Sequence, residues 1–252
     1  MKKTIVYIIT AITTLLPCTA LAGDIFEGIQ MKGRVGYSIG GTAPIGIPAT
    51  IRSLDSYRLT PSFLVGIDVA LPIKDRWGVM TGLHYENKGM DADVTTKAYR
   101  MELRKGNELI EGLFTGRVKQ KVTEWMATLP VMATCQLGDK VQLKAGPYIS
   151  LLFNKDFSGI ASDGYLRQGD PTGPKIVMGD KEGEWATYEF DDEMRRLQFG
   201  VAAGVDWQVY KRFGVSADLS WGFTGIFKSS FKTVEQTLYP IYGTIGVFYR
   251  IK

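Results

Sequence analysis

Long runs of strict alternation between apolar and other residues constrain the fold of this chain more than any other feature. From Arg212 to Phe223 it reads RFGVSADLSWGF, with an apolar residue at every second position. Successive side chains of a β-strand point to opposite faces, so this run predicts one extended strand with one apolar face. Asp218 lies in the middle of the second face. The kind of protein depends on whether this face meets solvent, a cleft or the inside of a closed barrel.

Seven further segments repeat the pattern, at 31–39, 63–71, 77–86, 124–137, 141–153, 197–207 and 239–251. Short connections rich in turn-forming residues (72–76, 138–140 and 210–211) alternate with long ones (40–61, 88–121, 154–195 and 225–238). Short turns on one side and long loops on the other, on an even number of antiparallel strands, are typical of membrane barrels. We therefore predict an all-β fold, an eight-stranded antiparallel up-and-down transmembrane β-barrel with short periplasmic turns and long extracellular loops, over residues 23–252.

The first 22 residues have the pattern of a cleaved secretory signal peptide. A basic start at Met1-Lys2-Lys3 is followed by an apolar run from Thr4 to Leu16 and by the small-residue sequence Ala20-Leu21-Ala22. A membrane anchor and a lipoprotein modified at Cys18 are the alternatives. Removal of Cys18 would leave Cys135 as the only cysteine, which excludes an internal disulfide framework.

Aromatic residues of the apolar faces gather at the two ends of the predicted strands. Valine, isoleucine, leucine and alanine lie between these two rows, as in the interfacial girdles of a membrane barrel. A soluble periplasmic lipocalin-like barrel would turn its apolar face inward and would have no reason to sort aromatic residues by depth. We predict that the girdles comprise Tyr37, Phe63, Trp77, Tyr85, Trp125, Phe153, Trp207, Phe213, Trp221, Phe223, Tyr239 and Tyr249.

The second face of each strand then points into the barrel. It is rich in small residues with a few large ones, which suits the narrow, filled interior of an eight-stranded barrel. Buried charges need partners, so acids and bases on this face predict ion pairs that join Asp68, Asp206 or Asp218 to Arg34, Lys144 or Arg250. The predicted lumenal polar network comprises Arg34, Asp68, His84, Glu86, Glu124, Lys144, Asp206, Asp218 and Arg250.

Catalytic, cofactor and metal motifs are weak, and we expect no catalytic residue, no cofactor and no metal site. His84 and Glu86 form the H-x-E part of a zinc-deaminase signature, but the P-C-x-x-C part does not occur, so a structural role is favoured. Acidic residues at Asp91 and Asp93 and at 191–193 match no calcium-loop spacing. The net charge of +4 is dispersed among acids, which argues against nucleic acid as a partner. Basic residues of the loop 88–121 are weak candidates for contacts with lipopolysaccharide phosphates.

Several segments resemble the PorT-like outer-membrane β-barrel family of Bacteroidetes. These are PSFLVGIDVALPI, WGVMTGLHYENKG, TLPVMAT, LKAGPYIS and FGVAAGVDW, with Gly66, Lys88-Gly89, Pro130 and Gly146-Pro147 at positions that the family favours. The resemblance runs from about Thr60 to the C-terminus and implies an eight-stranded barrel in the outer membrane of a Bacteroidetes-type bacterium. The founding member is linked to type IX secretion, whereas most relatives have no assigned role, and fold alone does not give function. The chain departs from the aromatic last residue of many such barrels, because it ends FYRIK.

The expected function is that of a non-enzymatic membrane anchor in the cell outer membrane. Its long loops would bind partners or serve as a secretion or envelope accessory, because rigid scaffolds carry function on loops. The alternatives are a small porin-like channel, an outer-membrane enzyme and the soluble lipocalin-like barrel. Expected partners are outer-membrane lipid and lipopolysaccharide, the barrel-assembly machinery during insertion, and a secretion-system or surface partner of unknown identity.

Overall fold

The computed structural model describes residues 28–44, 48–58, 60, 62–106, 108–231, 233 and 237–251. The predicted signal peptide (1–22), including Cys18, lies outside these residues. Within them, every helix is too short or too polar to cross a membrane.

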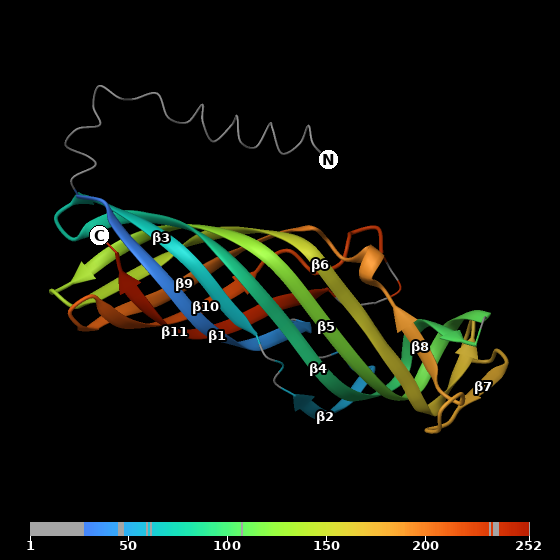
Figure 1. The fold of residues 1–252 in the computed structure, drawn as a ribbon. Coiled ribbons are helices and arrows are strands. Elements are labelled where there is room, and N and C mark those ends of the chain that lie inside the picture. The colour runs from blue at the N-terminus through green and yellow to red at the C-terminus, as the bar shows by residue number, and fades with distance from the viewer. Residues whose placement is uncertain are drawn as a thin grey trace.

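Eight antiparallel strands pair in a closed ring (Figure 1). The order is β1, β3, β4, β5, β6, β9, β10 and β11, and β11 pairs back to β1, which confirms the prediction of an antiparallel ring of eight strands. The ring strands are β1 Gln30–Pro44, β3 Phe63–Lys74, β4 Trp77–Lys105, β5 Glu108–Leu137, β6 Val141–Gln168, β9 Leu197–Tyr210, β10 Phe213–Gly222 and β11 Leu238–Arg250.

Three neighbouring strands of the ring are about twice as long as the others. β4, β5 and β6 have 29, 30 and 28 residues, whereas the other ring strands have 10 to 15. Past the ring they continue as one sheet, with β4 and β5 paired from Asp91–Lys121 to Lys105–Glu108. Three short strands, β2 Ile51–Arg58, β7 Lys175–Met178 and β8 Ala186–Glu189, join this extension. We call the extension the head; it comprises β2, 88–105, 108–124, 154–168, β7 and β8.

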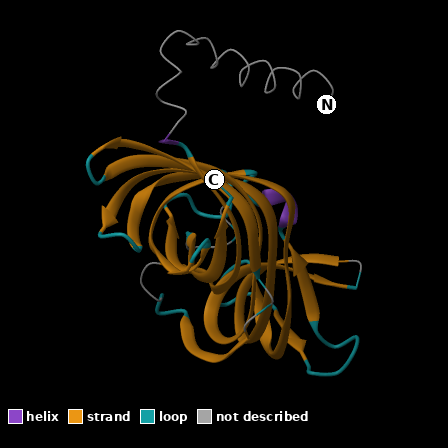
Figure 2. Cartoon of the chain, turned by 60° about the vertical axis from the view of Figure 1, so that its left-hand side comes forward, coloured by secondary structure: helices purple, strands orange, loops and turns teal. Residues whose placement is uncertain are grey.

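The head differs from the loops expected at 88–121 and 154–195. Dense charge in these segments favours a loop interpretation, yet Met90, Ala92 and Val94 alternate with polar residues just as the ring strands do. β8 then closes the head, because Thr187 pairs with Ile160 of β6 on one side and with Arg104 of β4 on the other. Strands make up most of the described chain, as Figure 2 shows. The described residues thus form 11 strands in one sheet.

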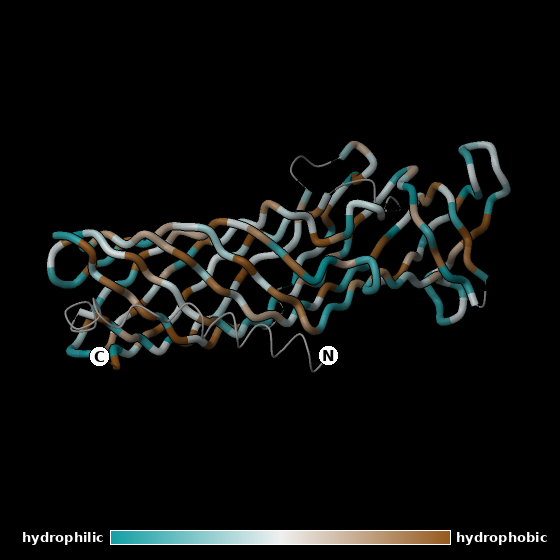
Figure 3. Tube along the Cα trace, turned by 90° about the horizontal axis from the view of Figure 1, so that it is seen from above, coloured by the Kyte–Doolittle hydropathy of each residue, from teal (hydrophilic) through white to brown (hydrophobic). Residues whose placement is uncertain are grey.

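Ring and head bury opposite kinds of side chain. Apolar side chains of the ring point outward and polar ones point inward, so apolar and polar residues alternate along each strand in Figure 3. Ile245 and Leu83, for example, are 67% and 62% exposed, whereas Asp68 and Lys144 are buried. A soluble lipocalin-like barrel has the reverse arrangement. The head instead encloses a hydrophobic core that includes Leu103, Phe114, Val122, Phe157 and Leu166.

Candidate functional site

A cluster of ion pairs fills the middle of the ring. Asp206 on β9 accepts contacts from three cations, Lys32 at 3.0 Å, Arg34 at 3.3 Å and Lys144 at 2.7 Å. Arg34 also reaches Asp68 at 2.6 Å, and both Arg34 and Lys144 contact Asp218, at 3.1 Å and 2.8 Å. We call these six residues the central ion cluster. Its three cations and three carboxylates come from five strands, so the cluster cross-links the ring.

A second set of polar contacts leads from the central ion cluster toward the head. The Nε2 atom of His84 lies 2.7 Å from Asp68, and its Nδ1 atom lies 3.8 Å from Glu86. Glu86 in turn pairs with Lys88 at 2.7 Å, and the Lys88 ammonium lies over the rings of Tyr148 and Tyr242. His84 is therefore held between two carboxylates.

The remaining residues of the predicted lumenal polar network lie apart from these contacts. Glu124 accepts a 2.7 Å hydrogen bond from the Gln198 amide. Arg250 lies near the short-turn end, beside Gln142 in a separate cavity, and its buried Nε makes no hydrogen bond within the described residues. The prediction omitted Lys32, Lys88 and Gln198. Alternation places Lys32 on the same strand face as Arg34, and Lys88 on the same face as His84 and Glu86. The sequence pattern could therefore have identified both lysines as interior residues.

The interior of the ring is nearly full. Met80, Met132, Tyr148 and Tyr242 are at most 6% exposed there, and the cavity between the central ion cluster and Lys88 measures only about 40 Å³. Among the described residues, no group of three His, Cys, Asp or Glu side chains could hold a metal ion. The middle of the ring is thus a packed core, in which the charges of the central ion cluster are paired with one another.

Aromatic side chains lie on the outer face of the ring at both ends. At the head end, Trp125 packs on Phe63 and Tyr85, with ring centroids 5.4 Å and 5.6 Å away. At the short-turn end, Phe213 and Tyr249 lie 4.9 Å apart. The residues of the predicted girdles are partly or largely exposed, and Phe153, Trp207 and Phe223 are more than half exposed.

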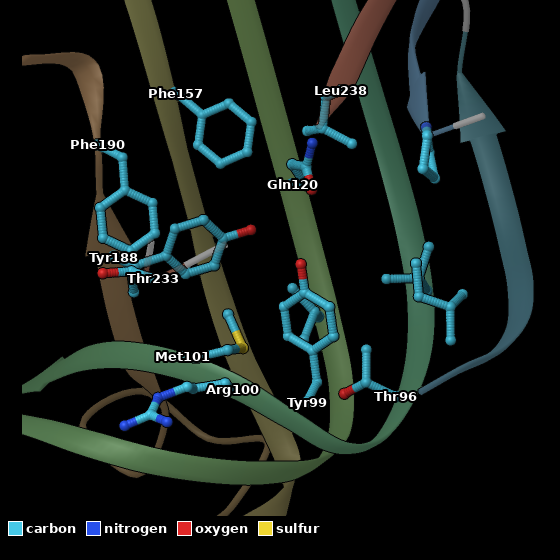
Figure 4. Close-up of a pocket in the computed structure, with 14 residues that line it drawn as sticks. Thr96, Tyr99, Arg100, Met101, Gln120, Phe157, Tyr188, Phe190, Thr233 and Leu238 are labelled. Atoms are coloured by element: carbon cyan, nitrogen blue, oxygen red, sulfur yellow. The ribbon is translucent and has the colours of Figure 1, made fainter. Parts of the chain in front are cut away.

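The head contains an apolar pocket beside its core (Figure 4). The residues that line it include Val94, Met101, Phe157, Tyr188, Phe190 and Leu238, and about 60 Å³ is free. The Tyr188 hydroxyl donates to the carbonyl of Lys119 at 3.3 Å, and burial raises the pKa of this phenol far above its usual value. Apart from Arg100, the residues that line the pocket are uncharged.

Solved structures of outer-membrane proteins resemble the chain only distantly. Ail, the attachment invasion locus protein of Yersinia pestis, in complex with the heparin analogue sucrose octasulfate, is 11% identical; the match covers 88% of this chain and 99% of Ail, with a TM-score of 0.39. Neisserial surface protein A is 10% identical over 89% of this chain and 97% of its own, with a TM-score of 0.38. OprG from Pseudomonas aeruginosa is 12% identical over 89% and 96%, with a TM-score of 0.34.

The family assignment comes from the sequence. No curated protein matches the chain. The model of the outer membrane protein beta-barrel domain matches residues 23–228, which is most of the chain and includes seven of the eight ring strands together with the head. The protein therefore belongs to the outer membrane protein beta-barrel domain family.

Proposed function

We propose that this protein is a non-enzymatic anchor that spans the outer membrane and presents the head at the cell surface as a binding module. The observation that carries the proposal is the continuation of β4, β5 and β6 past the ring as a head with its own hydrophobic core. A core of this size exceeds what a turn between two membrane strands needs. An ordered surface held at a constant distance from the membrane suits recognition of a partner.

The outer face of the ring supports its position in the membrane, and the lengths of its connections support the orientation. The aliphatic belt between Trp125 and the aromatic pair Phe213 and Tyr249 would lie in the hydrocarbon layer, as in other membrane barrels. The short turns after β3, β5 and β9 would then face the periplasm, and the head would face outward. A cleaved signal peptide at 1–22 would bring the chain to the assembly machinery.

The resemblance to the PorT-like family of Bacteroidetes suggests the setting for this binding. An accessory role in secretion or in the cell envelope would use the head as the contact surface for another component. The largely apolar pocket of Figure 4 is the place in the head where one side chain of that component would insert.

Cysteine labelling on intact cells tests the orientation. In a Cys135→Ser background, Leu109→Cys places a thiol on the head, where Leu109 is 61% exposed, and Asp139→Cys places one in the turn after β5. A membrane-impermeant maleimide should label position 109 on intact cells, and position 139 only after the outer membrane is permeabilised. Labelling of position 139 but not 109 on intact cells would contradict the proposed orientation.

Photo-cross-linking on living cells tests binding by the head. A photoreactive amino acid at Gln120, which lines the head pocket, should give a discrete cross-linked band. The same amino acid at Lys181, which is exposed in the turn before β8, is the matched control. If position 120 gave the same cross-linked bands as the control, the binding role would be contradicted. That result would not affect the proposed orientation.

A further inference from the structure

An open cavity of about 630 Å³ lies where the head meets the ring, beside the short helix η2 Asp191–Glu193. Four basic side chains line it, those of Lys155, Arg195, Arg196 and Lys228. They come from three segments that are distant in the sequence, so no single run of charge reveals them. We call this cavity the basic pocket.

The backbone holds these segments together. Met194 forms a β-bridge with Phe227, the Arg195 amide donates to Ile226 at 2.7 Å, and the Lys228 amide donates to Glu193 at 2.8 Å. The Leu152 amide then donates to the Arg196 carbonyl at 2.8 Å, which joins the pair of segments to β6. The basic side chains thus extend from a hydrogen-bonded framework.

The charges of the basic pocket are not balanced by carboxylates. Within the described residues, only Lys228 has a carboxylate within 4 Å, that of Glu193 at 3.8 Å, and both side chains are more than one-third exposed. Arg195 donates through Nε to the Phe227 carbonyl at 2.6 Å, and Lys155 donates to the Asp191 carbonyl. Asp192 is the only acid among the lining residues. Neighbouring cations repel one another, so an anion bound among them would lower the electrostatic energy.

The floor of the basic pocket is apolar and continues into the outer face of the ring. Leu197 lines the cavity and is 41% exposed. It is the first of the β9 side chains that point outward from the ring, and Phe199 is the next. Leu151 is the β6 partner of Leu197 and is 49% exposed. Cations directly above a lipid-facing surface are the arrangement that recognises an anionic lipid head group, whereas a soluble anion would not need the apolar floor.

We propose that the basic pocket binds the phosphate-bearing head group of an outer-membrane lipid, whose acyl chains lie on the outward face that begins at Leu197. The inference rests on the proposed function for the position of the membrane. Arginine forms paired hydrogen bonds with phosphate oxygens, so Arg195 and Arg196 would orient the group. Lys155 and Lys228 would add charge from the two sides.

Lipid binding to the purified full chain in detergent micelles tests the proposal. The probes are bis-phosphorylated lipid A and the same lipid A with both phosphates removed, measured by native mass spectrometry. We expect preferential binding of the phosphorylated form. The variant Arg196→Gln/Lys228→Gln should weaken this binding about 20-fold, because each basic residue beside an anionic lipid contributes about a factor of five.

The matched control is Lys97→Gln/Lys181→Gln, which removes two exposed basic residues from the head away from the basic pocket. It should bind the phosphorylated lipid as the unchanged protein does, and heat-modifiable migration should show that both variants keep the folded barrel. Equal binding of the two lipids, equal loss in both variants, or complete displacement by millimolar inorganic phosphate would each overturn the proposal. Micelles have no sidedness, so an inverted orientation in the labelling experiment would not change these outcomes.

Discussion

At the residue scale, Asp206 is the side chain on which the interior of the ring depends most. Its carboxylate contacts Lys32, Arg34 and Lys144, and all four side chains are at most 4% exposed. A buried ion pair contributes little net stability compared with a well-packed apolar pair, but the loss of one partner leaves uncompensated charge. Asp206 therefore matters because three cations need it.

We expect Asp206→Ala to destabilise the folded barrel by about 3–5 kcal/mol, since it leaves buried cations with too few carboxylates. The measurement is the midpoint of guanidinium unfolding in micelles, followed by loss of the heat-modifiable band. Glu111→Gln is the control, because its pair with Arg100 at 3.0 Å is about half exposed and contributes roughly 0–1 kcal/mol. Equal unfolding midpoints for the two variants would show that the central ion cluster does not hold the ring together.

At the element scale, β4, β5 and β6 belong to two structures at once. β4 and β6 begin in the ring and β5 ends in it, and in these parts most apolar residues face outward. The remaining part of each strand lies in the head, where apolar residues face a core. A register shift in the β5–β6 pairing between Trp125 and Met126 marks the transition. The extra residue lies on β6 and shifts its alternation, so that Ser150 and Leu152 face inward before it and Phe157 faces inward after it.

The two halves should be separable in stability. Phe114→Ala removes a fully buried ring from the head core, and we expect a loss of about 3–5 kcal/mol that is confined to the head. Limited proteolysis should then cut the head while the ring keeps its heat-modifiable migration. Leu109→Ala, at an exposed position of the same strand, should leave the head protected. Loss of the heat-modifiable band in the Phe114 variant would mean that ring and head fold as one unit.

At the scale of the whole molecule, the ring is a cylinder with a packed middle, and it continues at one end into the folded head. The interior is filled by the central ion cluster and by large side chains such as Tyr148 and Tyr242, next to small ones. Gly200, for instance, leaves the space that the Tyr148 ring occupies, since a Cβ there would lie 2.6 Å from that ring. An eight-stranded ring packed in this way favours an anchor over a channel.

We expect planar-bilayer recordings of the purified protein to show no steady conductance, because the middle of the ring, between the central ion cluster and Lys88, has only about 40 Å³ of free space. A variant with the head deleted but the ring strands intact should be equally silent, since the block lies in the ring. Stable, voltage-independent steps from the unchanged protein would restore the channel as the preferred function.

The sequence by itself determined the ring. Alternation with a period of two assigns each residue of a strand to one face, and sorted aromatic residues such as Trp125 and Phe213 indicate which face meets lipid. These signals are local, so they can be read without knowing which strands are neighbours. They identified seven residues that the structure brings together, Arg34, Asp68, His84, Glu86, Lys144, Asp206 and Asp218.

Only the tertiary structure decided the pairing of those charges and the existence of the head and the basic pocket. Asp206 and Lys32 are 174 residues apart in the sequence, yet their side chains are in contact. The register of the paired strands, and not the distance along the chain, determines which side chains face each other inside a closed ring. The head depends on Thr187 of β8 pairing with both β4 and β6. Likewise, Lys155, Arg196 and Lys228 meet only because backbone hydrogen bonds align three separate segments. Long-range pairing of this kind leaves no periodic signal along the chain.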